Sequence, residues 1–285
     1  MANTIADKLT YLSATKNAIL QAIIAKGVEV TDTDTFRSYA DKISSIQTGG
    51  GGTVNLPDGT RFSYSKFTTV SDSIFPYLEQ QDVMDSMFAY CTNLTTVPLF
   101  DTSNVNNMYY MFYGCKVLET VPQFNTVNVT DMGYMFSSCT KLTTVPQFNT
   151  VNVTNMSYMF SLCSKLQTVP LFDTSNVAYM NSMFNMCESL TSVPLFDINK
   201  VDNMRSMFYG CSSLANLGGF TGLKLSLDLS SSSKLTVDSV MNVINNAKDM
   251  TSSPRTLTLR QDVFNKLSKE QIATASAKGW NIAAK

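Results

Sequence analysis

The sequence predicts a right-handed α/β solenoid of 24-residue repeats, with a helical anchor before it and a strand-helix cap after it. Met-Phe pairs recur every 24 residues from Met87, and Val-Pro pairs recur at the same interval from Val97. The cysteines keep this interval too, at Cys91, Cys115, Cys139, Cys163, Cys187 and Cys211. Because no insertion or deletion breaks the register, we expect equal coils that stack around one continuous apolar core.

Each repeat is expected to contain a strand, a turn and a short helix. The unit at residues 97–120 reads VPLFDTSNVNNMYYMFYGCKVLET. Its apolar residues Met108, Met111, Phe112 and Cys115 fall at i, i+3, i+4 and i+7, which favours a helix of one or two turns. The segment LTTVPLF from Leu94 predicts a strand, which its proline keeps short. The DTSN segment between them is typical of a turn.

This repeat pattern, F-D-T-S-N-V-x-x-M-x-x-M-F-x-x-C-x-x-L-x-x-V-P, resembles the BspA-type leucine-rich repeat family over residues 67–220. Members of that family are mostly surface adhesins or ligand-binding proteins. The resemblance therefore implies a leucine-rich repeat solenoid with a binding role and no catalytic residues. The flanks, which begin TIADKLTYLSATKNAIL and end ASAKGWNIA, resemble virion fibre proteins from phages of gut Bacteroidetes.

The chain divides into four predicted parts. These are a helical anchor or oligomerisation segment at 1–47, a glycine-rich linker at 48–53, the solenoid at 54–220 and a capping region at 221–285. Helices are expected over residues 3–26 and 35–46, as an internal hairpin or as an oligomerising anchor, with a trimer favoured. The apolar seam of the first helix consists of Ile5, Leu9, Leu12, Ile19 and Ile23.

The capping region is expected to continue the alternation of strands and helices. KLSLDL and TLTL predict strands, and residues 237–250 and 260–278 predict helices. Trp280 and Ile282 would lie in a final strand, where core packing is the expected role of the tryptophan.

Composition excludes several functional classes. The net charge of −1, with 15% charged residues, gives no electrostatic basis for binding nucleic acid or an anionic membrane. The N-terminus MANTIADKLTYL does not resemble a secretory signal, and the apolar run AILQAIIA is too short to span a bilayer. The chain has no histidine and no nucleophile or phosphate-loop motif, so we expect neither an enzyme nor a cofactor.

The repeated cysteines and acidic residues are interpreted as structural. Equal spacing without a CxxC pair favours buried free thiols over disulfides or a metal site. Asp101, Asp173 and Asp197 share one repeat position with Asn125 and Asn149, which favours turn capping over a calcium ladder. A row of asparagines is expected to form hydrogen bonds with the backbone of the turns; it consists of Asn104, Asn128, Asn152 and Asn176.

Two rows of side chains are candidates for contact with a ligand. Tyr110, Tyr134 and Tyr158 share a position beside the core methionines and are expected to point outward. Aromatic rings among Asn, Ser and Thr suit the faces of sugars, although ordinary surface tyrosine remains the alternative. On the strand face, Thr120, Thr144 and Thr168 form a row of hydroxyls.

Together these observations predict a non-enzymatic bacteriophage virion protein, a head or tail fibre that presents a solenoid for adhesion to host-surface glycan. Its expected partners are other virion proteins, bound through the N-terminal helices, and its expected location is the virion. The alternatives are a BspA-like adhesin on a bacterial cell surface and a purely structural capsid or tail scaffold. Neither nucleic acid nor membrane is an expected partner.

Overall fold

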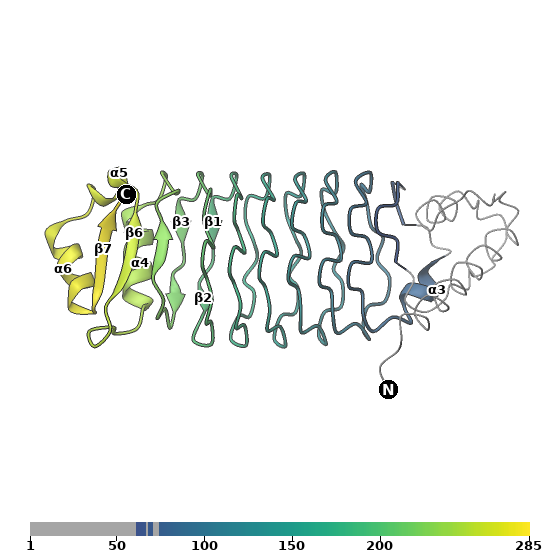
Figure 1. Cartoon of the computed structure of the whole chain (residues 1–285), viewed down its shortest axis with the longest axis horizontal. Coiled ribbons are helices and arrows are strands. Elements are labelled where there is room, and N and C mark those ends of the chain that lie inside the picture. The colour runs from purple at the N-terminus through teal and green to yellow at the C-terminus, as the bar shows by residue number, and fades with distance from the viewer. Residues whose placement is uncertain (1–60, 67, 71–73) are drawn as a thin grey trace, which may run out of the picture.

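The computed structural model describes residues 61–66, 68–70 and 74–285. In these residues, coils of similar shape lie side by side in an elongated stack, and the strands and helices of the C-terminal region close one end (Figure 1). The predicted anchor, with Ile5, Leu9, Leu12, Ile19 and Ile23, lies outside the described residues. So do the predicted linker at 48–53 and residues 54–60 of the predicted solenoid.

Backbone hydrogen bonds join each coil to the next. Asn107, Asp131 and Asn155 form successive parallel bridges at 24-residue intervals. The N–H of Met108 donates to the carbonyl of Asp131 at 2.9 Å, and the N–H of Tyr110 donates to Gly133 at 3.0 Å. The 24-residue period of the sequence is therefore also the spacing of the residues that pair between neighbouring coils. This confirms the predicted repeat protein.

The strands of the repeats are short, as predicted. Strand β1 (Ser192–Val193) pairs in parallel with β3 (Asn216–Leu217), and β2 (Phe196–Asp197) pairs with β4 (Phe220–Thr221). Pro194 lies between β1 and β2 and has no N–H to donate. The proline of each Val-Pro pair therefore limits the ladder to short stretches.

The predicted helix in each repeat is wrong. Residues 82–226 form turns and short strands and no helix, and α3 (Phe75–Leu78) precedes them. The N–H groups of Met108, Tyr110 and Phe112 donate to the following coil instead of a carbonyl four residues back. Tyr110 also has a φ of 57°, which a right-handed helix cannot contain. The apolar residues at i, i+3, i+4 and i+7 thus belong to successive turns that bury one face, and not to a helix.

Two rows of phenylalanine form the centre of the stack. The rings of Phe112 and Phe136 stack with centroids 5.7 Å apart, and those of Phe136 and Phe160 with centroids 5.8 Å apart. Phe148 of the second row packs against Phe136 at 6.2 Å. Methionine, leucine and cysteine from every coil fill the remaining space and are buried. Each coil thus lacks a complete core of its own and depends on its neighbours.

The cysteines are free and buried, as predicted. Each thiol donates to a phenylalanine carbonyl of the preceding coil, as Cys139 does to Phe112 at 3.1 Å and Cys163 to Phe136 at 3.0 Å. Burial raises the pKa of both thiols well above the usual range. These groups are therefore structural hydrogen-bond donors in an apolar core, without the character of a nucleophile.

Polar side chains form hydrogen bonds with the backbone N–H and carbonyl groups of the turns and of neighbouring coils. The carboxylate of Asp173 accepts from the N–H of Ser175 at 3.0 Å, so the predicted turn capping is confirmed. The amide of Asn152 donates to the Val127 carbonyl of the preceding coil at 2.7 Å, which confirms the structural role of the asparagine row. The buried hydroxyls of Thr102, Thr126, Thr150 and Thr174 each donate to a carbonyl of the next coil.

The C-terminal region contains the strands and helices expected after residue 220. A parallel sheet has the order β5-β6-β7. Its strands and the helices around them are β5 (Leu227–Leu229), α4 (Val237–Asn246), β6 (Arg255–Leu259), α5 (Gln261–Phe264), α6 (Lys269–Ala277) and β7 (Trp280–Ala284). Trp280 is buried, and its indole N–H donates to the Lys248 carbonyl at 2.9 Å, which fits the expected core role.

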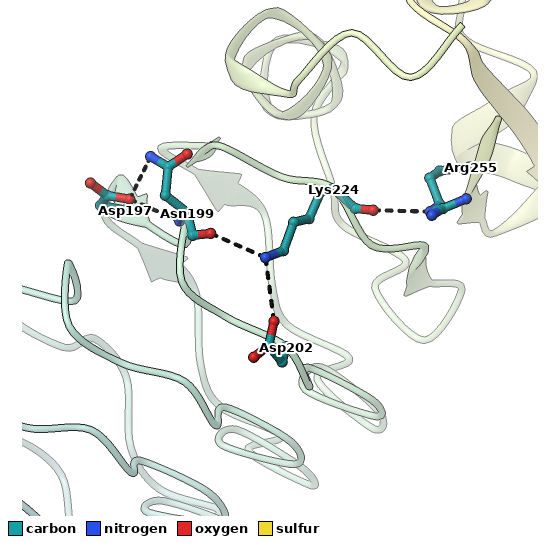
Figure 2. A network of polar contacts seen from close by, with 5 residues as sticks. All are labelled: Asp197, Asn199, Asp202, Lys224 and Arg255. Carbon is teal, nitrogen blue, oxygen red and sulfur yellow. Dashed lines mark hydrogen bonds and ion pairs between the residues drawn. The ribbon is translucent and has the colours of Figure 1, made fainter. Parts of the chain in front are cut away.

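A polar network attaches this region to the last repeat (Figure 2). The ammonium of Lys224 donates to the Asn199 carbonyl at 3.2 Å and pairs with Asp202 at 3.3 Å. Arg255 donates to the Lys224 carbonyl at 2.9 Å, and Asp197 caps Asn199. The segment that leaves the stack is thus held to both the last coil and the sheet.

The phenylalanine row should dominate stability. Phe160→Ala removes a fully buried ring from the central coil and should lower the free energy of unfolding by about 3–5 kcal/mol. Leu171→Ala, at a side chain that is 60% exposed, is the control and should change it little. Urea denaturation followed by circular dichroism measures both, and equal losses would show that the buried and exposed faces are misassigned.

Candidate functional site

Three of the predicted ligand-facing tyrosines form a continuous stack. The rings of Tyr110 and Tyr134 lie 4.5 Å apart with planes 10° from parallel, and those of Tyr134 and Tyr158 lie 4.4 Å apart at 7°. All three side chains are half-buried, so each ring contacts its neighbours and also meets solvent. The structure thus brings together the three residues that their shared repeat position singles out.

The stack continues through four further tyrosines. Tyr113 meets Tyr110 edge-on at 4.9 Å and Tyr90 at 5.0 Å, and Tyr64 stacks on Tyr90 at 4.5 Å. Tyr109 meets Tyr110 edge-on at 4.4 Å. We call the whole group the tyrosine cluster; its members are Tyr64, Tyr90, Tyr109, Tyr110, Tyr113, Tyr134 and Tyr158.

Tyr64 and Tyr90 were not among the predicted ligand-facing residues. Tyr90 occupies a different repeat position from Tyr110, so an alignment of the repeats does not connect them. The one signal in the sequence is Gly114, one repeat after Tyr90. A Cβ at this glycine would lie 3.0 Å from the Tyr90 ring, and its φ of +72° also favours glycine.

The backbone holds the stacked tyrosines in an unfavourable conformation. Tyr110, Tyr134 and Tyr158 have φ values of 57°, 56° and 56°, in the left-handed region that large side chains rarely adopt. Ser86, Ser182 and Ser206 take the same conformation in other coils, so the coil imposes it whatever the residue. The coil and not the residue type therefore sets this conformation, and the tyrosines add ring stacking that a serine cannot supply.

Gly133 makes room for the edge of the cluster. A Cβ on this residue would lie 2.9 Å from the Tyr109 ring and 2.8 Å from the amide of Asn155. The equivalent positions carry larger residues, Asp85, Tyr109, Ser157, Asn181 and Arg205. The missing side chain lets Tyr109 lie over the next coil and meet Tyr134 edge-on at 5.8 Å.

Two members of the cluster, Tyr109 and Tyr134, have a raised pKa. Partial burial, with the nearby Tyr110 hydroxyl, raises the pKa of Tyr109 to about 12. Partial burial and the neighbouring tyrosines also raise the pKa of Tyr134 well above its ordinary value. The site thus presents apolar ring surfaces and uncharged hydroxyls, which suits a ligand with an apolar face and hydroxyl edges.

The predicted threonine row lies on a different ladder. Thr120, Thr144 and Thr168 are exposed, and Thr168 bridges Ser192, whereas the tyrosines follow the ladder of Asn107 and Asp131. Exposed leucines and glutamines accompany the threonines, and Gln147 donates to the Leu171 carbonyl at 2.6 Å. The threonines therefore form a second surface, which lacks the aromatic rings of the first.

Neither a metal centre nor a membrane-spanning helix is found among the described residues. No group of three or more Cys, Asp or Glu side chains is arranged there to hold a metal ion. No helix in that part of the chain is both long and apolar enough to cross a membrane.

The fold defines a repeat protein of stacked coils. A family model described as "Mycoplasma protein of unknown function, DUF285" matches residues 82–191 and 143–252. The two matches together run from residue 82 to 252, more than half of the 285-residue chain, and the chain belongs to this family. No curated protein matches the sequence.

The raised tyrosine pKa values predict a loss of stability at high pH. A tyrosine in the unfolded chain ionises near the ordinary pKa of 10.0, whereas folded Tyr109 has its pKa raised to about 12. Ionisation therefore favours the unfolded chain, and the stability present below pH 10 should fall as pH rises toward 12. Absorbance at the tyrosinate band and thermal melting between pH 8 and 12 would measure this.

Tyr109→Phe provides the control for the alkaline titration. The variant should lose part of the decline in melting temperature above pH 10, because one perturbed group is gone. A decline identical to that of the parent protein would assign the alkaline transition to other groups, such as the buried thiols.

Proposed function

We propose that this chain is a non-enzymatic binding protein that presents the tyrosine cluster to carbohydrate on a host surface. The observation that carries the proposal is the stack of Tyr110, Tyr134 and Tyr158, half-exposed and held in a left-handed backbone conformation. Packing of the core explains the phenylalanine rows and the thiols but gives no reason for rings at this edge. Stacked neutral rings suit the apolar faces of sugars.

We assign the coils to a right-handed BspA-type leucine-rich repeat solenoid, on the strength of the repeated F-D-T-S-N-V and V-P signatures. The membership in the DUF285 family supports it at the level of the repeat. The BspA-type proteins that the sequence resembles are mostly adhesins, in keeping with a binding role.

We place the protein on a bacteriophage virion, as a head or tail fibre. The support is the resemblance of the flanking segments to virion fibre proteins, together with a repeat region that is long, regular and weakly charged. The segment with Ile5, Leu9 and Leu12 would join the fibre to other virion proteins as a homo-oligomer, with a trimer favoured. Several copies on one particle would multiply a weak affinity for each glycan.

The second candidate is a BspA-like adhesin on a bacterial cell surface. The family description, which refers to mycoplasma, favours a cellular protein. Immunogold electron microscopy of virions and of bacteria distinguishes the two locations. A purely structural scaffold on a capsid or tail is the third, and it predicts no carbohydrate binding.

The tyrosine cluster should determine carbohydrate affinity. On a glycan array and then by calorimetry with the best glycan, Tyr134→Ala should weaken binding about two- to tenfold, because it removes the central ring of the stack. Tyr179→Ala is the matched control, since this tyrosine is 52% exposed and no member of the cluster. Thr144→Ala tests the rival surface and should also bind normally.

Two results would overturn the proposal. One is an absence of binding to glycans and host cells by the full oligomeric protein. The other is equal affinity of the Tyr134→Ala and Tyr179→Ala variants, which would move the binding surface away from the cluster.

A further inference from the structure

The ladder that runs through Asn107 and Asp131 stops at the last repeat. The N–H groups of Met180 and Ser182 donate to the carbonyls of Asn203 and Arg205 in the next coil, at 2.8 and 2.9 Å. The equivalent N–H groups of Met204 and Ser206 have no acceptor among the described residues. At this edge the next segment of the chain, β5, pairs with β6 of the C-terminal sheet instead. The other ladder continues, since the N–H of Thr236 donates to the Ala215 carbonyl at 3.0 Å.

A groove lies between this open edge and the first strand of the sheet. One part has a volume of about 330 Å³ and lies between Met204–Met207 of the last coil and Leu225–Asp228 at β5. A second part of about 280 Å³ is lined by Arg205, Ser206, Tyr209, Asp228 and Ser231. Because Arg205, Ser206 and Asp228 line both parts, we treat them as one site, the junction groove.

The carboxylates of the junction groove are already paired, whereas its arginine is not. Asp202 pairs with Lys224 at 3.3 Å (Figure 2), and Asp228 pairs with Lys285 at 3.7 Å. The guanidinium of Arg205 is exposed and has no bonded partner among the described residues. The groove thus has one uncompensated positive charge beside two open N–H donors, a combination that favours a carboxylate.

The last coil also differs in sequence from the coils before it. At the repeat position of Arg205, the three preceding coils carry the smaller residues Gly133, Ser157 and Asn181. At the position of Tyr209, they carry the smaller residues Ser137, Ser161 and Asn185. Inside the stack, such short side chains fit against the next coil, as Ser157 does when it donates to Asn181 at 2.9 Å. Tyr209 is 61% exposed and lines the groove with Arg205.

We infer that the junction groove binds an acidic sugar, such as a uronic acid unit of a host polysaccharide. Arg205 and the N–H groups of Met204 and Ser206 bind the carboxylate, and the ring of Tyr209 packs against a sugar face. Asp228 and Ser231 accept from the sugar hydroxyls. The inference rests on the proposed class of ligand, carbohydrate, but assigns a separate site at the end of the stack.

The geometry favours a sugar over an extended peptide. A peptide strand would need a straight row of donors and acceptors along the edge. Ser206 has a φ of 57°, which turns the chain of the last coil away from an extended line after the first donor. A compact ring with one carboxylate needs only the two N–H groups that line the groove, those of Met204 and Ser206.

The test compares two sugars that differ only in the carboxylate. Methyl β-D-glucuronide and methyl β-D-glucoside are titrated into the full-length protein, and NMR measures the dissociation constants. The glucuronide should bind roughly tenfold more tightly, and Arg205→Gln should weaken its binding by about the same factor. Tyr209→Ala should weaken both sugars, whereas Lys165→Gln, an equal change of charge in a central coil, should weaken neither.

The outcomes separate this inference from the proposed function. Equal binding of the two sugars, or normal glucuronide binding by Arg205→Gln, overturns the junction groove as an acidic-sugar site. So does displacement of the glucuronide by an uncharged extended peptide at equal concentration. If Tyr134→Ala still weakens glycan binding in that case, the tyrosine cluster retains its role and only the groove fails.

Discussion

The hydrogen bonds that join each coil to the next in a 24-residue register are the constraint on which this structure depends. Once Met108 bonds to Asp131 and Tyr110 to Gly133, every side chain lies beside its counterpart in the neighbouring coil. The phenylalanine rows, the thiol donors and the asparagine amides all follow from this one relation. A single inserted residue would shift every row at once, which explains why the repeats keep an unbroken length.

The interior of the repeats could be predicted from the sequence because their repetition displays it directly. The free thiols, the capping by Asp173 and the short strands were all predicted correctly. The helix in each repeat was not, because apolar residues at i, i+3 and i+4 also fit two successive turns that bury one face. Sequence patterns gave no sign of the left-handed conformation at Tyr110, since tyrosine does not favour it.

The candidate sites were predictable only in part, since they depend on differences between repeats. The shared position of Tyr110, Tyr134 and Tyr158 identified the centre of the cluster, but Tyr64 and Tyr90 join it through contacts across positions. The junction groove exists because β5 pairs with the C-terminal sheet, which no repeat pattern reveals. The cluster thus combines a repeated tyrosine with residues that are not repeated, and the junction groove lies where Arg205 and Tyr209 depart from the repeat.

Among the described residues, the last coil of the stack has an edge with unpaired backbone N–H groups. An open ladder edge can pair with another chain, and a charged side chain is a common protection against this. Arg205 supplies such a charge next to the open donors of Met204 and Ser206. Protection alone does not account for Tyr209, because an exposed ring at an open edge would promote association. A ligand that engages both the charge and the ring accounts for the pair, and an acidic sugar has the chemistry to do so.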